Sequence, residues 1–341
     1  MSNNTAAWLN AAKSRPFEVR SAPVWTPGEN EILIRNRAIA INPVDGNLQA
    51  APEPRWSVNY PMIPGHDVAG VVVAIGPNVS RFKEGDRILG HAVGVFSKEP
   101  KGSGFQAYTI LRANLASEIP ENISFERAAV IPLGLSTAAC GLFQDAFLGL
   151  QLPTVPPQKP TGHTILICGG ASSVGSNAIQ LAVSAGYDVI TTSSASNFEY
   201  VKNLGASQVF DYNSTTISAD IVDALNEKTF IGALDCVGHS AWELCMDVVS
   251  KSTGNKFIAT TLRGYTPPPD GVTIVPIFGT SLKDNKIGEA VYEHFLPKAL
   301  EAGTFVPAPE AFVVGHGLES IQDAVDIQHK GVSAKKVVVS L

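Results

Sequence analysis

A short run of glycines and serines, residues 169–175 (GGASSVG), has the residue types of a phosphate-binding loop. It follows the apolar segment 164–168 and precedes residues 176–185, which have helical spacing. Small residues let the backbone approach a pyrophosphate, and a helix N-terminus presents unpaired N–H groups and the positive end of its dipole. The spacing G-x-G-x-x-G is not met, and Ser172 stands where glycine is common. The alternative is a tight turn whose small residues serve packing alone.

The end of the next expected strand, residues 188–192, bears on which nucleotide is bound. An NAD site places Asp or Glu about 20 residues after the loop, to hold the ribose 2′-hydroxyl. Here residues 192–197 read TSSASN, and no acid appears before Glu199. A carboxylate would repel a 2′-phosphate, whereas hydroxyls and amides donate to it, so the segment favours NADPH, helped by Lys202 or Tyr212. Alternatively, these serines only cap the following helix.

Strand and helix patterns alternate from residue 164 onward. Short apolar runs predict further strands at residues 188–192, 209–210, 233–237 and 257–260. Helical spacing at residues 198–204 ends at Gly205, a favoured residue at a helix C-terminus. This alternation predicts an α/β domain built on a doubly wound parallel sheet with both faces covered.

The first 125 residues have a different texture. Residues 31–35 alternate as a half-buried strand does, and residues 68–75 form a β-branched apolar run. We expect this half to be rich in strands and poor in helices. Residues 124–127 (SFER) have the residue types of a helix N-cap, and residues 127–147 are rich in Ala and Leu. Four prolines at residues 153–160 predict a loop or stiff connector.

The composition limits the classes of function. At about 150 residues per domain, 341 residues predict two domains. A net charge of −6 without a basic run argues against nucleic acid. No apolar run approaches the roughly 18 residues of a membrane helix, and residues 1–4 lack the features of a secretory signal, so we expect a cytoplasmic protein. The four cysteines are scattered, which disfavours a disulfide framework or a cysteine-rich zinc site.

Further motifs resemble those of one enzyme family. Residues 65–76 (GHDVAGVVVAIG) and 82–87 (FKEGDR) resemble the GroES-like domain of medium-chain dehydrogenases/reductases. The likeness extends over nearly the whole chain, through residues 42–45 (NPVD), 131–138 (IPLGLSTA), 317–321 and 334–338. It implies a GroES-like substrate-side domain at residues 1–125, completed by residues 300–341. A Rossmann NADPH-binding domain is then expected at residues 126–299.

The chain departs from the zinc-dependent members of this family. It lacks the lobe of four closely spaced cysteines, and residues 42–45 supply no thiol. His66 is present, but Pro132 and Leu133 stand in the region where a further ligand would be needed. A catalytic zinc ion takes three protein ligands and a water, so we expect no metal and interpret His66 as a structural histidine.

Among zinc-free members, the chain resembles the fungal stand-alone enoyl reductases that serve polyketide synthases in trans during secondary metabolism. The resembling segments are residues 131–134 with Ser136 and Thr137, the prolines at 153–160, and residues 194–198 and 210–212. This resemblance implies cofactor contacts from Asn42, Pro43, Asp45, Asn47, Ala171, Ser172, Ser173, Val174, Gly175, Ser194, Ser196, Asn197 and Tyr212. It implies substrate contacts from Pro132, Leu133, Gly134, Ser136, Thr137, Ala139, Phe278, Gly279, Thr280, Ser281 and Leu282.

The expected reaction is reduction of an α,β-unsaturated carbonyl such as an enoyl thioester. NADPH would deliver hydride to the β-carbon, and the developing enolate needs hydrogen-bond donors. Thr137, Ser136 or backbone N–H groups at Leu133 and Gly134 are candidates, and the α-carbon would take a proton from Tyr60 or water. Related proteins often carry lysine where Asn47 stands, and an amide cannot act as an acid. No residue is assigned as catalytic beyond the candidates Tyr60 and Thr137.

Two other functions remain open at this point. One is a free-standing NADPH-dependent quinone or alkenal reductase, and the other is a non-catalytic NADPH-binding protein. The expected substrate is a small molecule or an enoyl group bound to a carrier protein of a polyketide synthase. Lys98 and Lys101 flank a glycine-containing stretch and would suit an acidic carrier, although a solvated loop explains them equally well. The acceptor, the chain length and the oligomeric state do not follow from the sequence.

Overall fold

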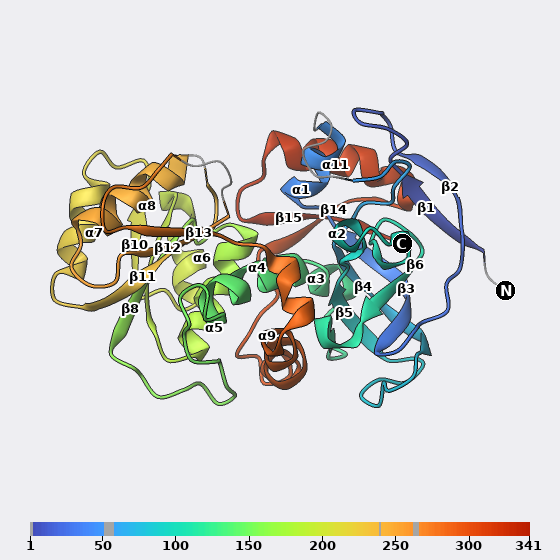
Figure 1. The fold of residues 1–341 in the computed structure, drawn as a ribbon, viewed down its shortest axis with the longest axis horizontal. Helices are drawn as coiled ribbons and strands as arrows, with labels where there is room; N and C mark the ends of the chain where they lie inside the picture. Colours follow the sequence, from blue (N-terminus) through green and yellow to red (C-terminus); the bar gives the residue numbers. More distant parts are fainter. Residues whose placement is uncertain (1–2, 51–57, 239, 262–265) are drawn as a thin grey trace. The chain divides into compact units, whose positions relative to one another are not determined.

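The computed structural model describes residues 3–50, 58–238, 240–261 and 266–341 (Figure 1). The chain divides into two compact units. Unit 1 comprises residues 1–133 and 300–341, and unit 2 comprises residues 134–299. The chain thus leaves unit 1 for unit 2 once and returns once.

The described part of unit 1 is organised on a seven-stranded sheet in the order β14-β15-β3-β4-β5-β7, with β6 also paired to β3. Neighbouring strands are antiparallel, except that β14 and β15 are parallel. Strands β1 and β2, which precede the other strands in the sequence, form a separate two-stranded antiparallel sheet. The strands are β1 (Asn4–Trp8), β2 (Glu18–Ala22), β3 (Glu31–Ala40), β4 (Asp67–Ile75), β5 (Arg87–His91), β6 (Tyr108–Arg112), β7 (Ala116–Glu118), β14 (Glu310–His316) and β15 (Lys335–Ser340).

Two helices of unit 1 were not anticipated from the sequence. Helix α1 (Pro43–Ala50) packs against α11 (Ile321–Lys330), where a Cβ on Gly46 would lie 3.6 Å from Val325 Cγ1 (Figure 1). Glycine and proline obscure the helical pattern of α1, because both residues disfavour helix interiors. The shorter helical segments are α2 (Gly94–Ser97), η1 (Pro100–Gly102), η2 (Ala113–Leu115), α3 (Phe125–Ala128) and η6 (Leu318–Ser320).

The described part of unit 2 holds a six-stranded parallel sheet in the order β10-β9-β8-β11-β12-β13. Its strands are β8 (His163–Cys168), β9 (Asp188–Ser193), β10 (Gln208–Asp211), β11 (Thr229–Asp235), β12 (Phe257–Thr260) and β13 (Thr273–Pro276). This is the doubly wound order in which the chain reverses direction across the sheet between its first and fourth strands, β8 and β11. Ligands of such sheets bind at the carboxyl ends of the strands beside that switch point. The predicted α/β fold class is confirmed.

The helices of unit 2 follow its strands. Helix α5 (Ser173–Ser184) packs on β8 and β9, and α8 (Ser240–Lys251) packs on β11 and β12 (Figure 1). The Ala- and Leu-rich region after Ser124 forms two helices, because Pro132 begins a new one, α4 (Pro132–Phe143). The others are η3 (Ala195–Asn197), α6 (Phe198–Asn203), α7 (Ile217–Leu225), η4 (Gly279–Asp284), α9 (Lys286–Glu289), the π-helical η5 (Ala290–Phe295) and α10 (Leu296–Glu301).

Within the described ranges, no helix combines the length and apolar character needed to cross a membrane.

Candidate functional site

The glycine and serine loop is fastened to the neighbouring strand β9. The Gly169 N–H donates to Thr192 Oγ1 at 2.9 Å, and the Gly170 N–H donates to the Thr192 carbonyl at 2.9 Å. Thr191 hydrogen-bonds the Ile167 carbonyl through its hydroxyl at 2.6 Å. Both glycine N–H groups are therefore used inside the protein, and they fix the loop at the carboxyl end of β8.

The next N–H groups of the loop divide into paired and unpaired ones. Ser172 caps α5, since its Oγ accepts from the Gly175 N–H at 3.0 Å, and its own N–H donates to the Gly169 carbonyl. In contrast, the N–H groups of Ala171, Ser173 and Val174 have no partner within the described part of the protein. Three unpaired N–H groups at the start of a twelve-residue helix form a site for an anion such as a pyrophosphate.

The loop also has the close packing that a phosphate cradle needs. A Cβ on Gly175 would lie 2.2 Å from the Gly169 carbonyl oxygen, so only glycine fits there. Gly169 has φ +82°, and a Cβ on it would lie 2.2 Å from Val237 Cγ2. These constraints explain the glycines in the absence of the usual spacing. The residues predicted to hold a dinucleotide pyrophosphate fit that group.

The segment after β9 presents hydroxyl and amide groups. Ser194 Oγ lies 3.0 Å from Ser196 Oγ and accepts from Asn197 Nδ2 at 3.0 Å. Tyr212 follows β10, is 54% exposed, and donates its N–H to the Ser193 carbonyl at 3.2 Å. The four predicted residues Ser194, Ser196, Asn197 and Tyr212 therefore lie at the carboxyl ends of the adjacent strands β9 and β10.

The acids near this segment are occupied elsewhere. Glu199 is largely exposed and lies 3.6 Å from Lys202, an ion pair on the surface of α6. Asp211 accepts from the backbone N–H and the side-chain amide of Asn213, each at 3.0 Å. Neither carboxylate is arranged as the ribose ligand of an NAD site.

Two supporting residues of this region were missed by sequence reasoning. Ser176 Oγ donates to the Gly170 carbonyl at 3.1 Å, and the Tyr200 hydroxyl lies 2.7 Å from the same Oγ. Because Ser176 has already used its one hydrogen, Tyr200 is the donor to Ser176. Burial raises the pKa of Tyr200 to about 12, so it keeps this proton. Tyr200 thereby links α6 to the glycine loop. The two residues of this contact lie 24 positions apart, so no local sequence pattern predicts it.

Asp235 was also missed, although it ends a buried strand of apolar residues. It is fully buried at the carboxyl end of β11, where Oδ1 accepts from the N–H groups of Val237 and Gly238 at 3.1 and 2.9 Å. Thr260 donates to Oδ2 at 2.7 Å. Asp235 therefore holds the turn that places Val237, 46% exposed, against Gly169.

The residues predicted to contact substrate meet on one side of α4. A Cβ on Gly134 would lie 2.9 Å from the Ser173 carbonyl oxygen, so the first turn of α4 touches the start of α5. A Cβ on Gly279 would lie 2.9 Å from Thr137 Oγ1, so η4 touches the second turn. The two predicted substrate segments are therefore neighbours, and one of them adjoins the phosphate loop.

The side chains of these two segments differ in how far they are exposed. Ser136 is fully buried, and its hydroxyl lies 2.7 Å from that of Tyr292. Ala139, Thr280 and Leu282 are also buried, so the better-exposed residues of the two segments are Leu133, Thr137, Phe278 and Ser281. Cys140 lies 3.5 Å from Ser281 Oγ, and burial raises the pKa of its thiol, which therefore stays protonated at neutral pH. Thr137 is thus the better placed of the two candidate hydroxyls.

Unit 1 contains a buried polar cluster built from another group of predicted residues. Asn42 donates through Nδ2 to Asp67 Oδ2 at 2.8 Å and accepts from Lys336 Nζ at 2.5 Å through Oδ1. Lys336 Nζ lies 2.9 Å from Asp67 Oδ2, and both side chains are almost entirely buried. Asp67 Oδ1 also accepts from the Leu133 N–H at 2.5 Å, at the start of α4. We name Asn42, Asp45, His66, Asp67 and Lys336 the buried cluster.

His66 and Asp45 complete the buried cluster. Asp45 accepts from the Asn42 N–H at 2.8 Å and lies 3.0 Å from His66 Nδ1, so that ring nitrogen carries the proton. The His66 Nε2 atom is buried without a hydrogen-bond partner among the described residues. The ring of His91 lies 6.3 Å away, and burial followed by the charge of His66 lowers the pKa of His91 to about 3.

The buried cluster does not fit a catalytic zinc ion. Both polar atoms of the Asn42 amide are committed to Asp67 and Lys336, and Asp45 is committed to Asn42 and His66. The described ranges hold no group of three or more His, Cys, Asp or Glu side chains that could bind a metal. We therefore derive no step through a metal.

The remaining unit 1 candidates are Pro43, Asn47 and Tyr60. Pro43 and Asn47 are exposed on α1, whereas Asn42 and Asp45 point their polar groups inward. Tyr60 is partly buried and packs against the apolar core of unit 1.

Comparison with known proteins places the chain in a family. Residues 28–121 match the alcohol dehydrogenase GroES-like domain, and residues 173–281 match the zinc-binding dehydrogenase domain. The chain is 56% identical over 339 residues to the zinc-binding alcohol dehydrogenase domain-containing protein cipB of Emericella nidulans, covering 99% of this chain and 98% of cipB. It is 37% identical over 340 residues to the trans-enoyl reductase himH of Aspergillus japonicus, covering 99% and 97%.

A solved structure supports the same assignment. The alcohol dehydrogenase superfamily protein of Novosphingobium aromaticivorans is 25% identical, with a TM-score of 0.79 and coverage of 99% of both chains. The sheet order of unit 2, its glycine loop and these similarities imply a nicotinamide cofactor. The chain is an oxidoreductase of the medium-chain dehydrogenase/reductase family.

Proposed function

We propose that this protein reduces the carbon–carbon double bond of an enoyl thioester with NADPH, acting in trans on a polyketide synthase. The observation that carries the proposal is the commitment of Asn42, Asp45 and Asp67 to internal partners. A site without metal ligands cannot polarise an alcohol through a metal ion, whereas a conjugated carbonyl needs only hydrogen-bond donors at its oxygen. The similarity to the trans-enoyl reductase himH, which extends over nearly the whole chain, also supports an enoyl thioester as the substrate.

The preference for NADPH rests on the surroundings of β9. The hydroxyls of Ser194 and Ser196, the amide of Asn197 and the hydroxyl of Tyr212 offer donors to a 2′-phosphate. No carboxylate is directed there among the described residues, since Glu199 pairs with Lys202 and Asp211 pairs with Asn213. The unpaired N–H groups of Ala171, Ser173 and Val174 would hold the pyrophosphate.

The chain's own residues position the reaction. When bound, the reduced nicotinamide supplies a hydride. Thr137 on α4 donates a hydrogen bond to the substrate oxygen, where negative charge develops as the β-carbon is reduced. Asp235 fixes the turn that holds Val237, an apolar surface beside the glycine loop. Tyr60 is packed against the unit 1 core and Asn47 is no acid, so we assign the proton at the α-carbon to water.

The test measures NADPH consumption with a 2-butenoyl thioester, a free enal and a quinone as separate acceptors. We expect thioester reduction with NADPH, a saturated thioester as product, and weaker activity with NADH. Oxidation of NADPH by quinone or enal with no turnover of any enoyl thioester would instead establish a free-standing quinone or alkenal reductase. Cofactor binding without turnover of any acceptor would establish a non-catalytic NADPH-binding protein.

A substitution tests the cofactor preference separately. Ser196→Asp places a carboxylate beside the proposed 2′-phosphate site, and we expect the NADPH-to-NADH affinity ratio to fall about tenfold or more. Ser80→Asp makes the same change at an exposed position of unit 1 and is the matched control. Equal effects of the two substitutions would refute the assignment of Ser196.

A further inference from the structure

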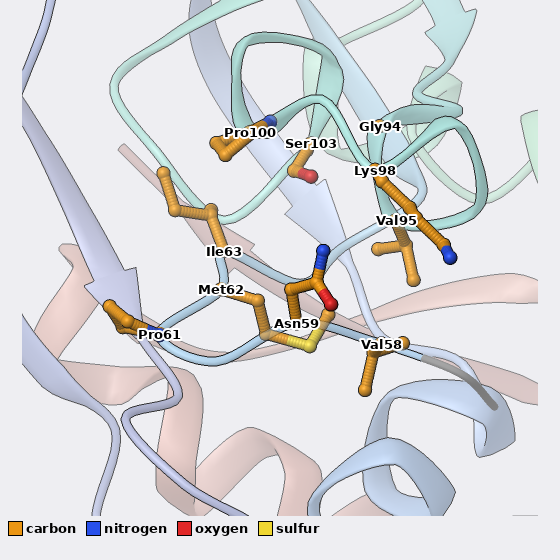
Figure 2. Close-up of a pocket in the computed structure, with 10 residues that line it drawn as sticks. All are labelled: Val58, Asn59, Pro61, Met62, Ile63, Gly94, Val95, Lys98, Pro100 and Ser103. Carbon is orange, nitrogen blue, oxygen red and sulfur yellow. The ribbon is translucent and has the colours of Figure 1, made fainter. Parts of the chain in front are cut away.

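Unit 1 contains a small pocket of about 70 Å³ that offers little to a ligand (Figure 2). Lys98 and Asn59 line it, and both side chains are exposed to solvent. Ser103 lines it as well, but its hydroxyl oxygen is buried, out of reach of solvent and therefore of a ligand. A different group of polar side chains, in unit 2, bears directly on the proposed reaction.

Polar side chains connect one face of α4 to the segment that contains η4 and η5. Residues 136, 140 and 144 are spaced by four, so they lie in a row along one side of the helix. Gln144 Nε2 donates to Ser281 Oγ at 3.0 Å, and Cys140 Sγ lies 3.5 Å from the same oxygen. The Ser136 hydroxyl, nearer the start of α4, lies 2.7 Å from that of Tyr292. We name these contacts the polar seam.

The bond between Ser136 and Tyr292 is the most deeply buried part of the polar seam. Both side chains are fully buried, whereas Gln144 and Ser281 are partly exposed. Serine is less favourable than alanine inside a helix, and a buried hydroxyl loses its bonds to water. A buried hydrogen bond, however, permits fewer arrangements of its two partners than an apolar contact does. The bond therefore restricts the rotation of α4 against η5.

Tyr292 lies in a helical segment of an uncommon kind. The segment η5 is π-helical, and its buried residues are Val291, Tyr292 and Phe295. Tyr292 is thus on the inner side of this segment. π-helical turns are rare and are found frequently at functional sites. The type of helix and the buried bond to α4 both favour a role for Tyr292 beyond filling space.

Thr137 is the residue whose direction depends on this bond. It directly follows Ser136, so its side chain projects about 100° further around α4, and it is partly exposed. The backbone of η4 lies close to it, since a Cβ on Gly279 would be 2.9 Å from Thr137 Oγ1. A donor in a reaction site must stay within about 0.5 Å of its productive position. A rotation of α4 would therefore misdirect the Thr137 hydroxyl.

We propose that Tyr292 is a positioning residue of the reaction: through Ser136 it holds α4 in the rotation that directs the Thr137 hydroxyl to the substrate oxygen. This inference rests on the proposed function, in which Thr137 donates to the oxygen where negative charge develops. Tyr292 is fully buried and acts only through Ser136. Loss of its hydroxyl should therefore lower kcat and leave the affinity for NADPH unchanged.

The experiment removes the Tyr292 hydroxyl in two backgrounds. In the otherwise wild-type protein, Tyr292→Phe should lower kcat for a 2-butenoyl thioester about tenfold, with a Kd for NADPH within about twofold of the wild-type value. Thr137→Val removes the donor itself and should lower kcat about a hundredfold. In the Thr137→Val background, Tyr292→Phe should cause no further loss, because the hydroxyl that Tyr292 positions is already gone.

Two further variants separate the positioning role from a general loss of structure. Tyr187→Phe is the matched control, since its hydroxyl accepts from the Gln151 N–H at 3.1 Å in the same unit but outside the polar seam, and kcat should not change. Ser136→Ala breaks the same bond from the α4 side and should reproduce the loss of about tenfold. Unchanged kcat in both Tyr292→Phe and Ser136→Ala would overturn the proposal. An equal loss from Tyr292→Phe with and without Thr137 would also overturn it.

A series of acceptors distinguishes this proposal from the proposed function. The variants are assayed with the 2-butenoyl thioester, a free enal and a quinone. If the thioester is reduced and Tyr292→Phe keeps the wild-type kcat, the positioning role fails and the proposed function stands. If only the enal or quinone is reduced, and Tyr292→Phe lowers that kcat only while Thr137 is present, the proposed function fails and the positioning role stands. Reduction of no acceptor would refute both.

Discussion

The buried cluster of unit 1 and the glycine loop of unit 2 are both rich in polar groups, but they differ in how many of those groups are hydrogen-bonded within the protein. In the buried cluster, the side chains of Asn42, Asp45 and Asp67 form hydrogen bonds or ion pairs with one another, with His66 and with Lys336. In the loop, the N–H groups of Ala171, Ser173 and Val174 have no described partner. Apart from His66 Nε2, the polar side-chain atoms of the buried cluster are paired among the described residues and hold structure, whereas the unpaired N–H groups of the loop are available to a ligand.

This contrast separates residues that touch a ligand from residues that position others. Asn42 and Asp45 were predicted to contact the cofactor, and this stays a prediction. Their side chains also hold the start of α1 through hydrogen bonds within the buried cluster. Asp67 extends the same role to the first turn of α4 through the Leu133 N–H. Substitutions in the buried cluster should therefore act mainly on stability, and substitutions in the loop mainly on cofactor binding.

The largest expected effect is that of Asp67→Asn. It leaves the ammonium of Lys336 buried without a counter-charge, which should lower the free energy of unfolding by about 3–5 kcal/mol. Urea unfolding followed by circular dichroism measures this loss. The double variant Asp67→Asn with Lys336→Met removes both charges, keeps an acceptor for the Leu133 N–H and should recover most of the stability. A double variant no more stable than Asp67→Asn would contradict the view that the stranded charge causes the loss.

His91 provides the next test, through pH. Its pKa is about 3 in the folded protein because it is buried and lies near His66, and 6.5 is its ordinary value. Below pH 6.5 the unfolded chain takes up a proton that the folded protein refuses. Stability therefore falls as the pH drops from 6.5 toward 3, by at most about 1.4 kcal/mol per pH unit, and is unaffected above 6.5.

Unfolding free energies measured across that pH range should decline less steeply in His91→Gln. His163→Gln, which alters an exposed histidine of unit 2, should keep the wild-type slope. Identical slopes in all three proteins would show that His91 does not control the acid response.

Gly175→Ala tests the loop side of the comparison. Its Cβ would meet the Gly169 carbonyl oxygen at 2.2 Å, so the loop must shift. We expect a loss of about 1–3 kcal/mol in stability and at least about a tenfold rise in the Kd for NADPH. Gly46→Ala on α1 meets only an ordinary 3.6 Å contact and should leave NADPH binding unchanged. Unchanged cofactor binding in Gly175→Ala would show that the loop does not hold the nucleotide.

The fold could be predicted well where the local sequence pattern of a segment determines its secondary structure. Strands β8 and β9, helix α5 and the loop between them follow from apolar periodicity and glycine placement, and the structure has them within a few residues. Helix α1 was missed because Pro43 and Gly46 mask its pattern, and its stability comes from packing on α11, which lies far along the chain. Strand β13, only four residues long, was missed for lack of a distinctive pattern.

The candidate site was predictable to a similar degree. The glycine loop and the acid-free segment after β9 are local features. The N–H groups of Ala171, Ser173 and Val174, which have no partner among the described residues, suit a phosphate. The roles of Tyr200 and Asp235 arise from contacts with Ser176, Val237 and Thr260, partners that the sequence does not pair. Similarly, Ser136 differs from Thr137 because it is buried against Tyr292, and the sequence does not show this contact.

The smallest expected effect compares the same helix cap in the two units. Ser172 caps α5 by accepting from Gly175 at 3.0 Å, and Ser124 caps α3 by accepting from Arg127 at 3.3 Å. Each serine-to-alanine change should cost about 1 kcal/mol or less. Because Ser172 also fixes the turn that aims the unpaired N–H groups, Ser172→Ala should weaken NADPH binding about fivefold, whereas Ser124→Ala should leave it unchanged. Titration of NADPH fluorescence measures both, and equal weakening by the two substitutions would mean that the cap acts only through global stability.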